Sequence, residues 1–277
     1  MSLPAGLGIF SFPSPGGSLS RSVNAYLLEG SRPVVIDSGF SADAAGGEAM
    51  GSHLTEFSGP GEGGGLLLLT HLHRDHAGGA EELSQKGFEV CLHREETRLH
   101  ADRISNLHAV RRIEDGETVE TPLGRLIALH TPGHSHGHLC FHWPEEGILF
   151  SGDLITAEPS SWVGPPEGDM TAYLNSLRRV AELPLRLILS GHGAPVEHPA
   201  EAIGAYIERR LEREGEILRL LEKGAARIPD LTTRIYRGRG LSPRLQAFAE
   251  KTVEAHLIKL CQEGRVRRSG DDLFSLS

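Results

Sequence analysis

This chain of 277 residues lacks a disulfide framework, a membrane-spanning apolar run and a basic leader segment. Its three cysteines, Cys91, Cys140 and Cys261, are far apart and odd in number, which favours buried thiols in a reducing compartment. No apolar run approaches the roughly 20 residues that cross a bilayer, and no charged segment followed by an apolar one opens the chain. These absences predict a cytoplasmic protein with no membrane partner.

Positive charge is scarce in the first part of the chain. Residues 1–200 hold 13 Lys and Arg against 25 Asp and Glu, a net charge of −12. Residues 201–277 hold 15 Lys and Arg against 12 Asp and Glu, a net charge of +3. An acidic domain attracts nucleic acid poorly, whereas bound cations would offset part of its charge.

Histidine is the residue type in excess, with 15 copies. Four candidate metal ligands lie within six residues, directly after the apolar run 66–70: His71, His73, Asp75 and His76. Imidazole and carboxylate suit zinc and the neighbouring divalent metals, and core packing does not explain three imidazoles in one short loop. The loop therefore predicts metal-assisted hydrolysis.

Short apolar runs and amphipathic stretches are mixed over residues 1–200, which predicts a layered α/β catalytic domain. The expected strands are 24–29, 33–37, 66–70, 88–92, 126–130, 139–142, 148–151 and 185–190. The expected helices are 77–86 and 171–183, the second with apolar residues at helical spacing.

The character of the sequence changes after residue 200. Residues 201–223, 229–236 and 244–263 are predicted helices, and the tail forms a predicted hairpin that turns at Gly270-Asp271. Three helices followed by a hairpin is the order of a winged-helix module. Residues 201–277 are therefore predicted to form a C-terminal winged-helix-like domain.

Three further candidate ligands, His134, Asp153 and His192, each follow a predicted strand and have a glycine beside them. Glycine lets the backbone turn sharply and approach a ligand closely. In α/β sheets ligands bind beyond the carboxyl ends of strands, so these loops can converge with residues 71–76 on one site.

The sequence resembles the metallo-β-lactamase superfamily in four motifs and in their order. The motifs are His71-x-His73-x-Asp75-His76, Thr131-Pro132-Gly133-His134, Ser151-Gly152-Asp153 and Ser190-Gly191-His192-Gly193. The resemblance implies an αββα sandwich and two divalent cations as cofactors. It also implies the following ligands: His71, His73 and His134 for the first metal, Asp75, His76 and His192 for the second, and Asp153 bridging both. Asp37, which matches an early aspartate of the family, would orient ligands through hydrogen bonds.

The seven-ligand set resembles that of glyoxalase II and RNase Z. Zinc is the expected metal, and iron and manganese are the alternatives. Two such cations would share a bridging hydroxide as nucleophile, and Asp75 is the candidate catalytic residue that orients it. β-Lactamases typically have a cysteine where Asp153 stands, so antibiotic hydrolysis is not expected. Glyoxalase II activity is disfavoured, since no matching glutathione-binding tail is present.

Within the superfamily, the tail 201–277 resembles that of the β-lactamase-like protein 2 group, whose animal members are endoribonucleases of single-stranded RNA. The chain departs from that group by an inserted loop, residues 162–169. Trp162 in this loop and His138 are candidate substrate contacts, and a packed structural role is the alternative for each. Arginines of the tail are candidates for a nucleic-acid face, a cover over the active site or a dimer contact: Arg234, Arg237, Arg239, Arg265, Arg267 and Arg268.

The expected function is metal-dependent hydrolysis of a small-molecule acyl ester or thioester, because the catalytic domain is acidic and the inserted loop shapes a discrete pocket. A single-strand-specific endoribonuclease is the first alternative, supported by the group resemblance and the basic tail. The second is a non-catalytic, metal-containing regulator that binds nucleic acid, which the intact ligand set disfavours. A homodimer is one possible oligomeric state, since family members are often dimers.

Overall fold

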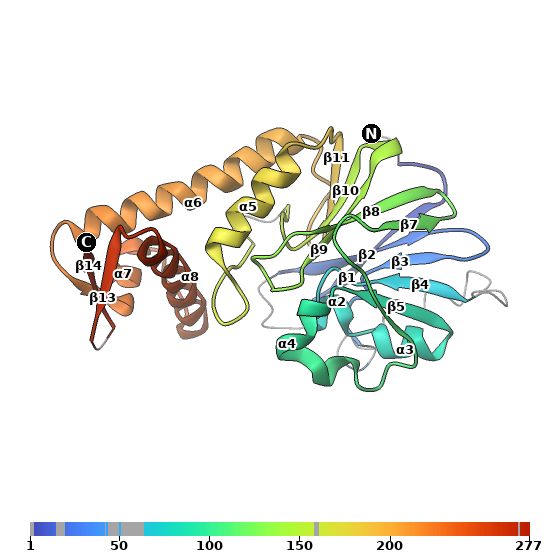
Figure 1. Cartoon of the computed structure of the whole chain (residues 1–277), viewed down its shortest axis with the longest axis horizontal. Coiled ribbons are helices and arrows are strands. Elements are labelled where there is room, and N and C mark those ends of the chain that lie inside the picture. The colour runs from blue at the N-terminus through green and yellow to red at the C-terminus, as the bar shows by residue number, and fades with distance from the viewer. Residues whose placement is uncertain are drawn as a thin grey trace.

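The computed structural model describes residues 3–14, 20–41, 43, 50, 64–157, 161–270 and 272–277. Two β-sheets lie face to face with helices on their outer faces, and the long helix α6 leads from this sandwich to a smaller C-terminal domain (Figure 1). The predicted αββα sandwich and winged-helix-like domain are therefore confirmed.

The first sheet has the strand order β1-β2-β3-β4-β5-β6. Its strands are β1 (Leu7–Pro13), β2 (Ser22–Leu28), β3 (Val34–Ile36), β4 (Gly65–Leu68), β5 (Phe88–Leu92) and β6 (Val110–Arg112). Strands β3 to β6 pair in parallel. Along β4, Leu66 and Leu68 face the core between the sheets, whereas Leu67 faces the core under the helices. This continuous apolar strand is thus buried on both faces, as parallel strands usually are.

The second sheet has the order β11-β10-β9-β8-β7, and within it only β10 and β11 are parallel neighbours among the pairings of the described residues. Its strands are β7 (Thr118–Thr121), β8 (Gly124–His130), β9 (Leu139–Trp143), β10 (Ile148–Gly152) and β11 (Leu187–Ser190). Strands β1, β6 and β7 were not predicted, because they are short or lack a clear apolar pattern.

Helices α2 (Arg74–Ala77), α3 (Ala80–Gln85) and α4 (Thr97–His100) lie on the side of the first sheet (Figure 1). Short 3₁₀ turns lie at η1 (Arg94–Glu96), η2 (Ala101–Ile104) and η3 (Pro144–Glu146). The prediction of one helix over 77–86 is wrong at its start, since Gly78 and Gly79 separate α2 from α3. A Cβ at Gly78 would lie 2.5 Å from the backbone nitrogen of Ser41, so this turn packs against another loop.

Helix α5 (Met170–Ala181) covers the second sheet with Tyr173, Leu174, Leu177 and Val180. Asp169 caps its N-terminus, since its side chain accepts a hydrogen bond from the backbone N–H of Ala172 at 2.9 Å. This cap fixes the end of the inserted loop 162–169 beside the sandwich.

The C-terminal domain has its own apolar core. Its elements are α6 (Pro199–Leu221), β12 (Ala226–Arg227), α7 (Ile228–Ile235), α8 (Pro243–Gln262), β13 (Val266–Ser269) and β14 (Leu273–Leu276). Helix α6 belongs to both domains, because Ile203 packs on α5 whereas Ile217 packs in the C-terminal core. The boundary after residue 200 stays a prediction, and Asp271 of the hairpin turn lies outside the described residues. Among the helices of the described residues, none is both long and apolar enough to cross a bilayer.

Candidate metal centre and its cavity

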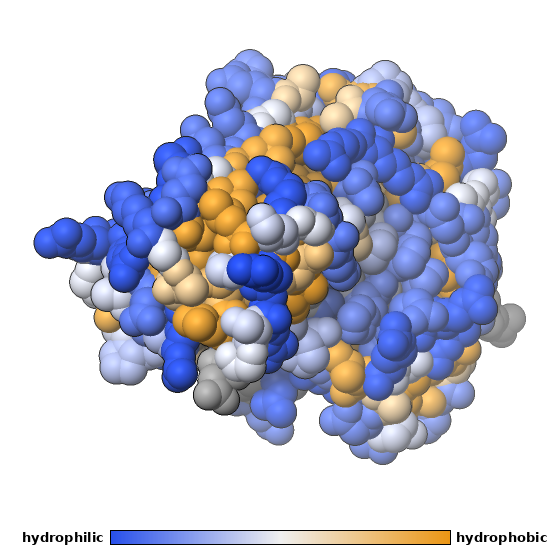
Figure 2. Space-filling view, turned by 60° about the vertical axis from the view of Figure 1, so that its left-hand side comes forward, coloured by the Kyte–Doolittle hydropathy of each residue, from blue (hydrophilic) through white to orange (hydrophobic). Residues whose placement is uncertain are grey.

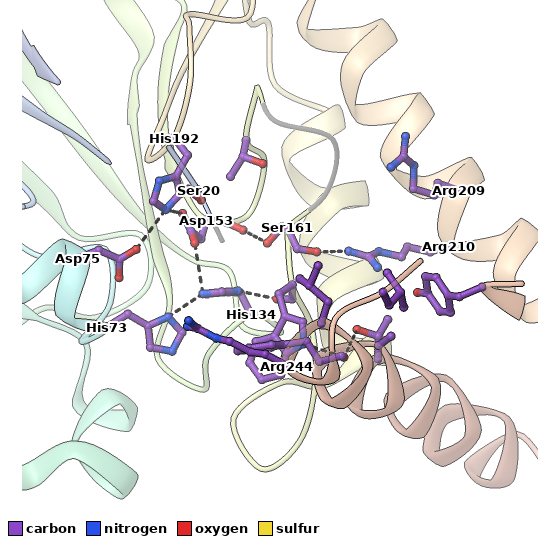
Figure 3. Close-up of a pocket in the computed structure, with 18 of the residues that line it drawn as sticks. Ser20, His73, Asp75, His134, Asp153, Ser161, His192, Arg209, Arg210 and Arg244 are labelled. Atoms are coloured by element: carbon purple, nitrogen blue, oxygen red, sulfur yellow. Dashed lines mark hydrogen bonds and ion pairs between the residues drawn. The ribbon is translucent and has the colours of Figure 1, made fainter. Parts of the chain in front are cut away.

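The seven predicted ligands lie on the segments that directly follow four strands, and two of them, Asp75 and His76, lie in α2. The structure brings all seven together at one edge of the sandwich. Within each of three groups the ligand atoms lie within 4.8 Å of one another: His71, His73 and His134; Asp75, His76 and His192; and His71, His76 and Asp153. Figure 3 shows the side chains of His73, Asp75, His134, Asp153 and His192 converging from these loops.

Asp153 lies between the two histidine groups. Its Oδ1 is 3.3 Å from Nε2 of His76 and 3.3 Å from Nε2 of His192. Its Oδ2 is 3.5 Å from Nε2 of His134. One carboxylate therefore reaches both groups, which is the position that a shared ligand of two cations would occupy.

The donor set fits divalent cations. Nε2 of His71 is buried and has no hydrogen-bond partner, although buried polar atoms are nearly always partnered. Nε2 of His76 and Nε2 of His192 face each other at 3.3 Å, and Nε2 of His134 faces Nδ1 of His73 at 3.0 Å. Lone pairs turned toward one another repel unless a cation or proton lies between them. These rings are thus arranged for a positive charge that they share.

The second ring nitrogen of each of two ligand histidines is held by an oxygen outside the cluster. Nδ1 of His134 donates to the carbonyl of Trp162 at 2.7 Å, and Nδ1 of His192 donates to the carbonyl of Ser22 at 2.6 Å. These bonds hold a proton on Nδ1, so each ring in its neutral form presents Nε2 to the cluster. The backbone thus selects the tautomer that binds a metal.

Asp37 lies beside the ligand cluster and is hydrogen-bonded to one of the candidate ligands. Its Oδ2 accepts a hydrogen bond from Nδ1 of His76 at 2.7 Å, and its Oδ1 accepts one from the backbone N–H of Thr70 at 2.8 Å. The Asp37 backbone has φ 57°, a left-handed conformation that a non-glycine residue rarely adopts. This unusual turn aims the carboxylate back at the ligand loop.

Glu167 is a residue of the site that the sequence did not reveal. Its Oε2 lies 2.5 Å from Nε2 of His73, and its Oε1 lies 2.9 Å from Nε2 of His100. Burial would raise the pKa of Glu167, but the hydrogen bonds and charges of His73 and His100 together outweigh burial and lower the pKa to about 2. The ionised carboxylate keeps a proton on Nε2 of His73 and directs Nδ1 to the cluster. The only signal in the sequence was its place in the inserted loop.

We expect Glu167→Gln to weaken metal binding by about tenfold, because the amide holds His73 less firmly than the carboxylate does. Competition with a chromophoric chelator measures the dissociation constant of the metal in each protein. Glu182→Gln, an exposed change at the end of α5, is the matched control. Equal affinities in the variant and the wild type would show that Glu167 does not position His73.

Charge is unevenly distributed within the cluster. Burial lowers the pKa of His71 well below its ordinary value, and the nearby rings of His76 and His73 lower it further. Burial would also lower the pKa of His192, but the carboxylates of Asp153 and Asp75 together outweigh burial and raise it to about 10. Burial would raise the pKa of Asp75, but the effects of His76 and His192 exceed it and lower that pKa to about 2. The carboxylates therefore favour positive charge next to His192.

The predicted substrate contact of His138 is not what the structure shows. The ring is fully buried and does not line the cavity. Its Nε2 accepts a hydrogen bond from the backbone N–H of Asp153 at 3.1 Å, and its Nδ1 lies 2.9 Å from Oγ1 of Thr131. The residue lies just before β9, under the loop that carries Asp153. It therefore supports the position of Asp153 and cannot touch a substrate.

Close packing explains the glycine beside His192. A Cβ at Gly191 would lie 2.5 Å from Cε1 of His76 and 2.7 Å from Oδ1 of Asp153. Both distances are shorter than any normal contact, so a larger residue would displace two ligands. The glycine is thus required by the packing of the cluster.

A cavity of about 710 Å³ leads from the cluster to the C-terminal domain. Its apolar wall includes Trp162, which therefore lies where it could contact a substrate. The substrate contact itself stays a prediction. The Trp162 ring packs edge-on against Phe248 of α8 at a centroid distance of 5.3 Å, and its Nε1 donates to the Phe248 carbonyl at 3.2 Å. Five arginines also line the cavity: Arg209, Arg210, Arg213, Arg239 and Arg244.

Exposed apolar side chains gather on the C-terminal side of the molecule, with hydrophilic side chains lying across them (Figure 2). Leu211 of α6 and Leu245 and Ile258 of α8 are exposed. Leu245 also lines the cavity, so the apolar character of its wall extends to the surface.

The family model of the metallo-beta-lactamase superfamily matches residues 20–192, which include all seven candidate ligands. The chain belongs to the metallo-beta-lactamase superfamily. A second model, the beta-lactamase associated winged helix domain, matches residues 228–274. Both matches agree with the order of elements in the structure.

Two kinds of named relative match most of the chain. A beta-lactamase-like protein 2 homolog of Caenorhabditis elegans is 28% identical over 266 residues, which cover 94% of this chain and 86% of that protein. An atrochrysone carboxyl ACP thioesterase of Passalora fulva is 29% identical over 266 residues, which cover 91% of this chain and 74% of that protein.

Two solved structures extend the comparison. The metallo-beta-lactamase family protein TTHA1429 of Thermus thermophilus aligns with a TM-score of 0.79 at 27% identity, covering 98% of this chain and 99% of that one. TTHA1623, solved in a di-iron-bound form, aligns with a TM-score of 0.52 at 33% identity, covering 69% of this chain and 96% of that one. The fold is therefore shared over nearly the full length of this chain with the first structure and over about two thirds of it with the second.

Proposed function

We propose that the chain is a two-metal hydrolase of acyl thioesters or esters. The observation that carries the proposal is the pair of histidine groups around Asp153, placed at the inner end of a cavity with an apolar wall. Superfamily membership and the thioesterase names of relatives support a hydrolase. In this proposal the seven candidate ligands have the roles that the resemblance to the superfamily implies.

The residues divide the work of the reaction among them. When bound, two divalent cations would activate a water molecule and polarise the acyl carbonyl. Asp75, ionised at neutral pH because its pKa is about 2, is positioned to accept a hydrogen bond from the attacking water. Trp162 and Phe248 offer aromatic surface to the acyl group. Their burial of the acyl chain would hold the carbonyl at the cluster.

Zinc is the proposed metal, and iron is the alternative that the di-iron form of TTHA1623 supports. Elemental analysis of protein purified without added metal distinguishes the two and counts the ions per chain. Two ions per chain support the proposal, whereas one would contradict the role given to Asp153. The homodimer also stays a proposal, which light scattering in solution tests.

An endoribonuclease of single-stranded RNA is the second candidate. The five arginines of the cavity favour it, and Tyr236 beside them offers a ring for base stacking. The net charge of −12 on residues 1–200 opposes it. A non-catalytic regulator gains no support, since it has no need of a cavity that leads to the ligand cluster.

We expect metal-loaded protein to hydrolyse acyl thioesters with a kcat/KM of about 10⁴ M⁻¹ s⁻¹ or more, the ordinary range of enzymes, and to leave single-stranded RNA uncut. Release of free thiol and gel analysis of a labelled oligoribonucleotide measure the two reactions in parallel. Asp75→Asn and metal-free protein are the matched controls for each. RNA cleavage without activity on any thioester or ester would overturn the proposal and support the endoribonuclease.

A further inference from the structure

We propose that the outer part of the cavity is a phosphate-binding subsite, so that the substrate is a thioester whose leaving thiol carries a phosphate group. The proposal rests on the thioesterase function and names the chemical class of its leaving group. It is carried by the arginines of α6, α8 and the segment between α7 and α8.

Arg210 is the central observation. Its side chain lines the cavity, yet the residue is only 5% exposed. One guanidinium nitrogen donates to the carbonyl of Ser161, and the Tyr173 ring lies 5.2 Å from the guanidinium carbon. Its Nε has no hydrogen-bond partner, and within the described part of the chain no carboxylate pairs with it. Figure 3 shows the side chain reaching from α6 toward Ser161 in the wall of the cavity.

A buried cation without an anion is costly, and neither a carbonyl nor an aromatic ring supplies the missing charge. The burial of the Arg210 guanidinium is therefore unfavourable unless an anion lies beside it. A negatively charged group in the cavity would remove this cost, because it would both accept a hydrogen bond from Nε of Arg210 and neutralise the positive charge.

Further arginines line the same cavity as Arg210, so that several guanidinium groups could bind one anion. The guanidinium carbons of Arg213 and Arg239 lie 4.7 and 5.5 Å from the centre of the Tyr236 ring. Nη1 of Arg213 donates to Glu216 at 2.8 Å, which holds that side chain in place. Arg244 extends from the start of α8 toward the side of the cavity that His134 lines (Figure 3). Among the described lining residues the only carboxylates are those of the metal centre, so the outer wall is cationic.

The chemistry of the wall selects phosphate. The planar fork of a guanidinium matches phosphate oxygens, and several forks around one cavity can bind one dianion from different sides. A carboxylate would use fewer of these donors. Phosphate is therefore the anion that fits the wall best.

We assign this phosphate to the leaving group, because Trp162 and Phe248 in the same wall are assigned to the acyl group. The metal centre lies at the inner end, where water attacks the acyl carbon, a C–O bond forms, and the C–S bond breaks to give a carboxylic acid and a thiol. The arginines lie on the side of the C-terminal domain, with Trp162 and Phe248 also in the wall. A volume of about 710 Å³ is in the ordinary range for pockets that enclose a small molecule. The size and the acidic catalytic domain favour a small phosphorylated thioester over an RNA chain.

A matched pair of substrates tests the subsite: S-benzoyl-4′-phosphopantetheine and S-benzoylpantetheine, which differ by one phosphate. For the wild type we expect kcat/KM to be higher for the phosphorylated substrate by about tenfold or more, as charged hydrogen bonds would give. In the variant Arg213→Ala/Arg239→Ala the ratio should approach one, with hydrolysis of S-benzoylpantetheine retained. Arg267→Ala removes an exposed arginine of β13 outside the cavity and should keep the wild-type ratio.

Calorimetry with the thioether S-methyl-4′-phosphopantetheine, which cannot be hydrolysed, tests the subsite without activity. Binding should weaken by about tenfold in the double variant and in Arg210→Gln, and S-methylpantetheine should bind all proteins weakly. Equal kcat/KM for the two thioesters with equal binding of the two thioethers would overturn the subsite and leave the thioesterase function intact. If neither thioester is hydrolysed but the phosphorylated thioether binds tightly, the thioesterase function is overturned and the phosphate subsite is kept. Loss of RNA cleavage in the double variant, with a thioester ratio of one in the wild type, would overturn the proposal in favour of RNA.

Discussion

Replacing Asp153 by alanine is expected to lower kcat/KM by about a thousandfold or more and to reduce the metal content below two ions per chain. The carboxylate lies within 3.5 Å of ring nitrogens from both histidine groups. Its removal deletes the anion that both cations would share, and leaves their charges to repel each other. Steady-state hydrolysis and elemental analysis of the same sample measure the two effects together.

Two further variants separate this effect from damage to the fold. Asp153→Asn keeps the shape of the side chain and removes its charge, so it should lose activity with a melting temperature near that of the metal-free wild type. Asp102→Ala removes an exposed carboxylate outside the cavity and should leave both activity and metal content unchanged. Two tightly bound ions and full activity in Asp153→Ala would contradict the shared position of this residue.

The fold and the ligand cluster were predictable from the sequence, because the candidate ligands follow strands with a recognisable apolar pattern. His134, Asp153 and His192 each follow a strand that is apolar enough to recognise, and the ends of such strands meet at one edge of a sheet. Local pattern therefore located groups that are distant along the chain. Family resemblance then gave each of them a role.

Contacts that depend on tertiary structure were not predictable in this way. Glu167 meets His73 across 94 positions of the chain, and no local pattern marks either partner for the other. His138 stands one residue before a strand, where the pattern does not tell whether its ring faces the cavity or the core. The structure resolves this, since the ring lies under Asp153.

The arginines of the cavity show the same limit. Of the tail arginines considered from the sequence, Arg239 lines the cavity, whereas Arg209, Arg210 and Arg213 lie on α6 and were not singled out. An amphipathic helix shows which face is apolar, but not that its polar face closes the cavity of another domain. The C-terminal domain thus contributes to the candidate substrate site, as the cover considered for Arg239 would, but mostly through arginines that no local pattern marks.

Metal affinity is expected to rise steeply with pH between 7 and 9. The pKa of His192 in the metal-free protein is raised to about 10, because the carboxylates of Asp153 and Asp75 together outweigh the effect of burial. A metal that binds its Nε2 must displace that proton, so the dissociation constant should fall about tenfold for each unit of pH. The sign for stability is opposite: the raised pKa stabilises the metal-free fold fully below pH 6.5, and this contribution is lost as pH rises through about 10.

Chelator competition at pH 7, 8 and 9 measures the affinity, and thermal unfolding of metal-free protein over pH 6 to 10 measures the stability. His192→Gln should reduce the slope of affinity against pH by about one proton, whereas His108→Gln, an exposed change, should leave it unaltered. An affinity that does not change over these two pH units would mean that His192 is already unprotonated without metal. The ring would then gain nothing from Asp153 in the metal-free protein, and the cluster would be preorganised for cations by its hydrogen bonds to outer oxygens alone.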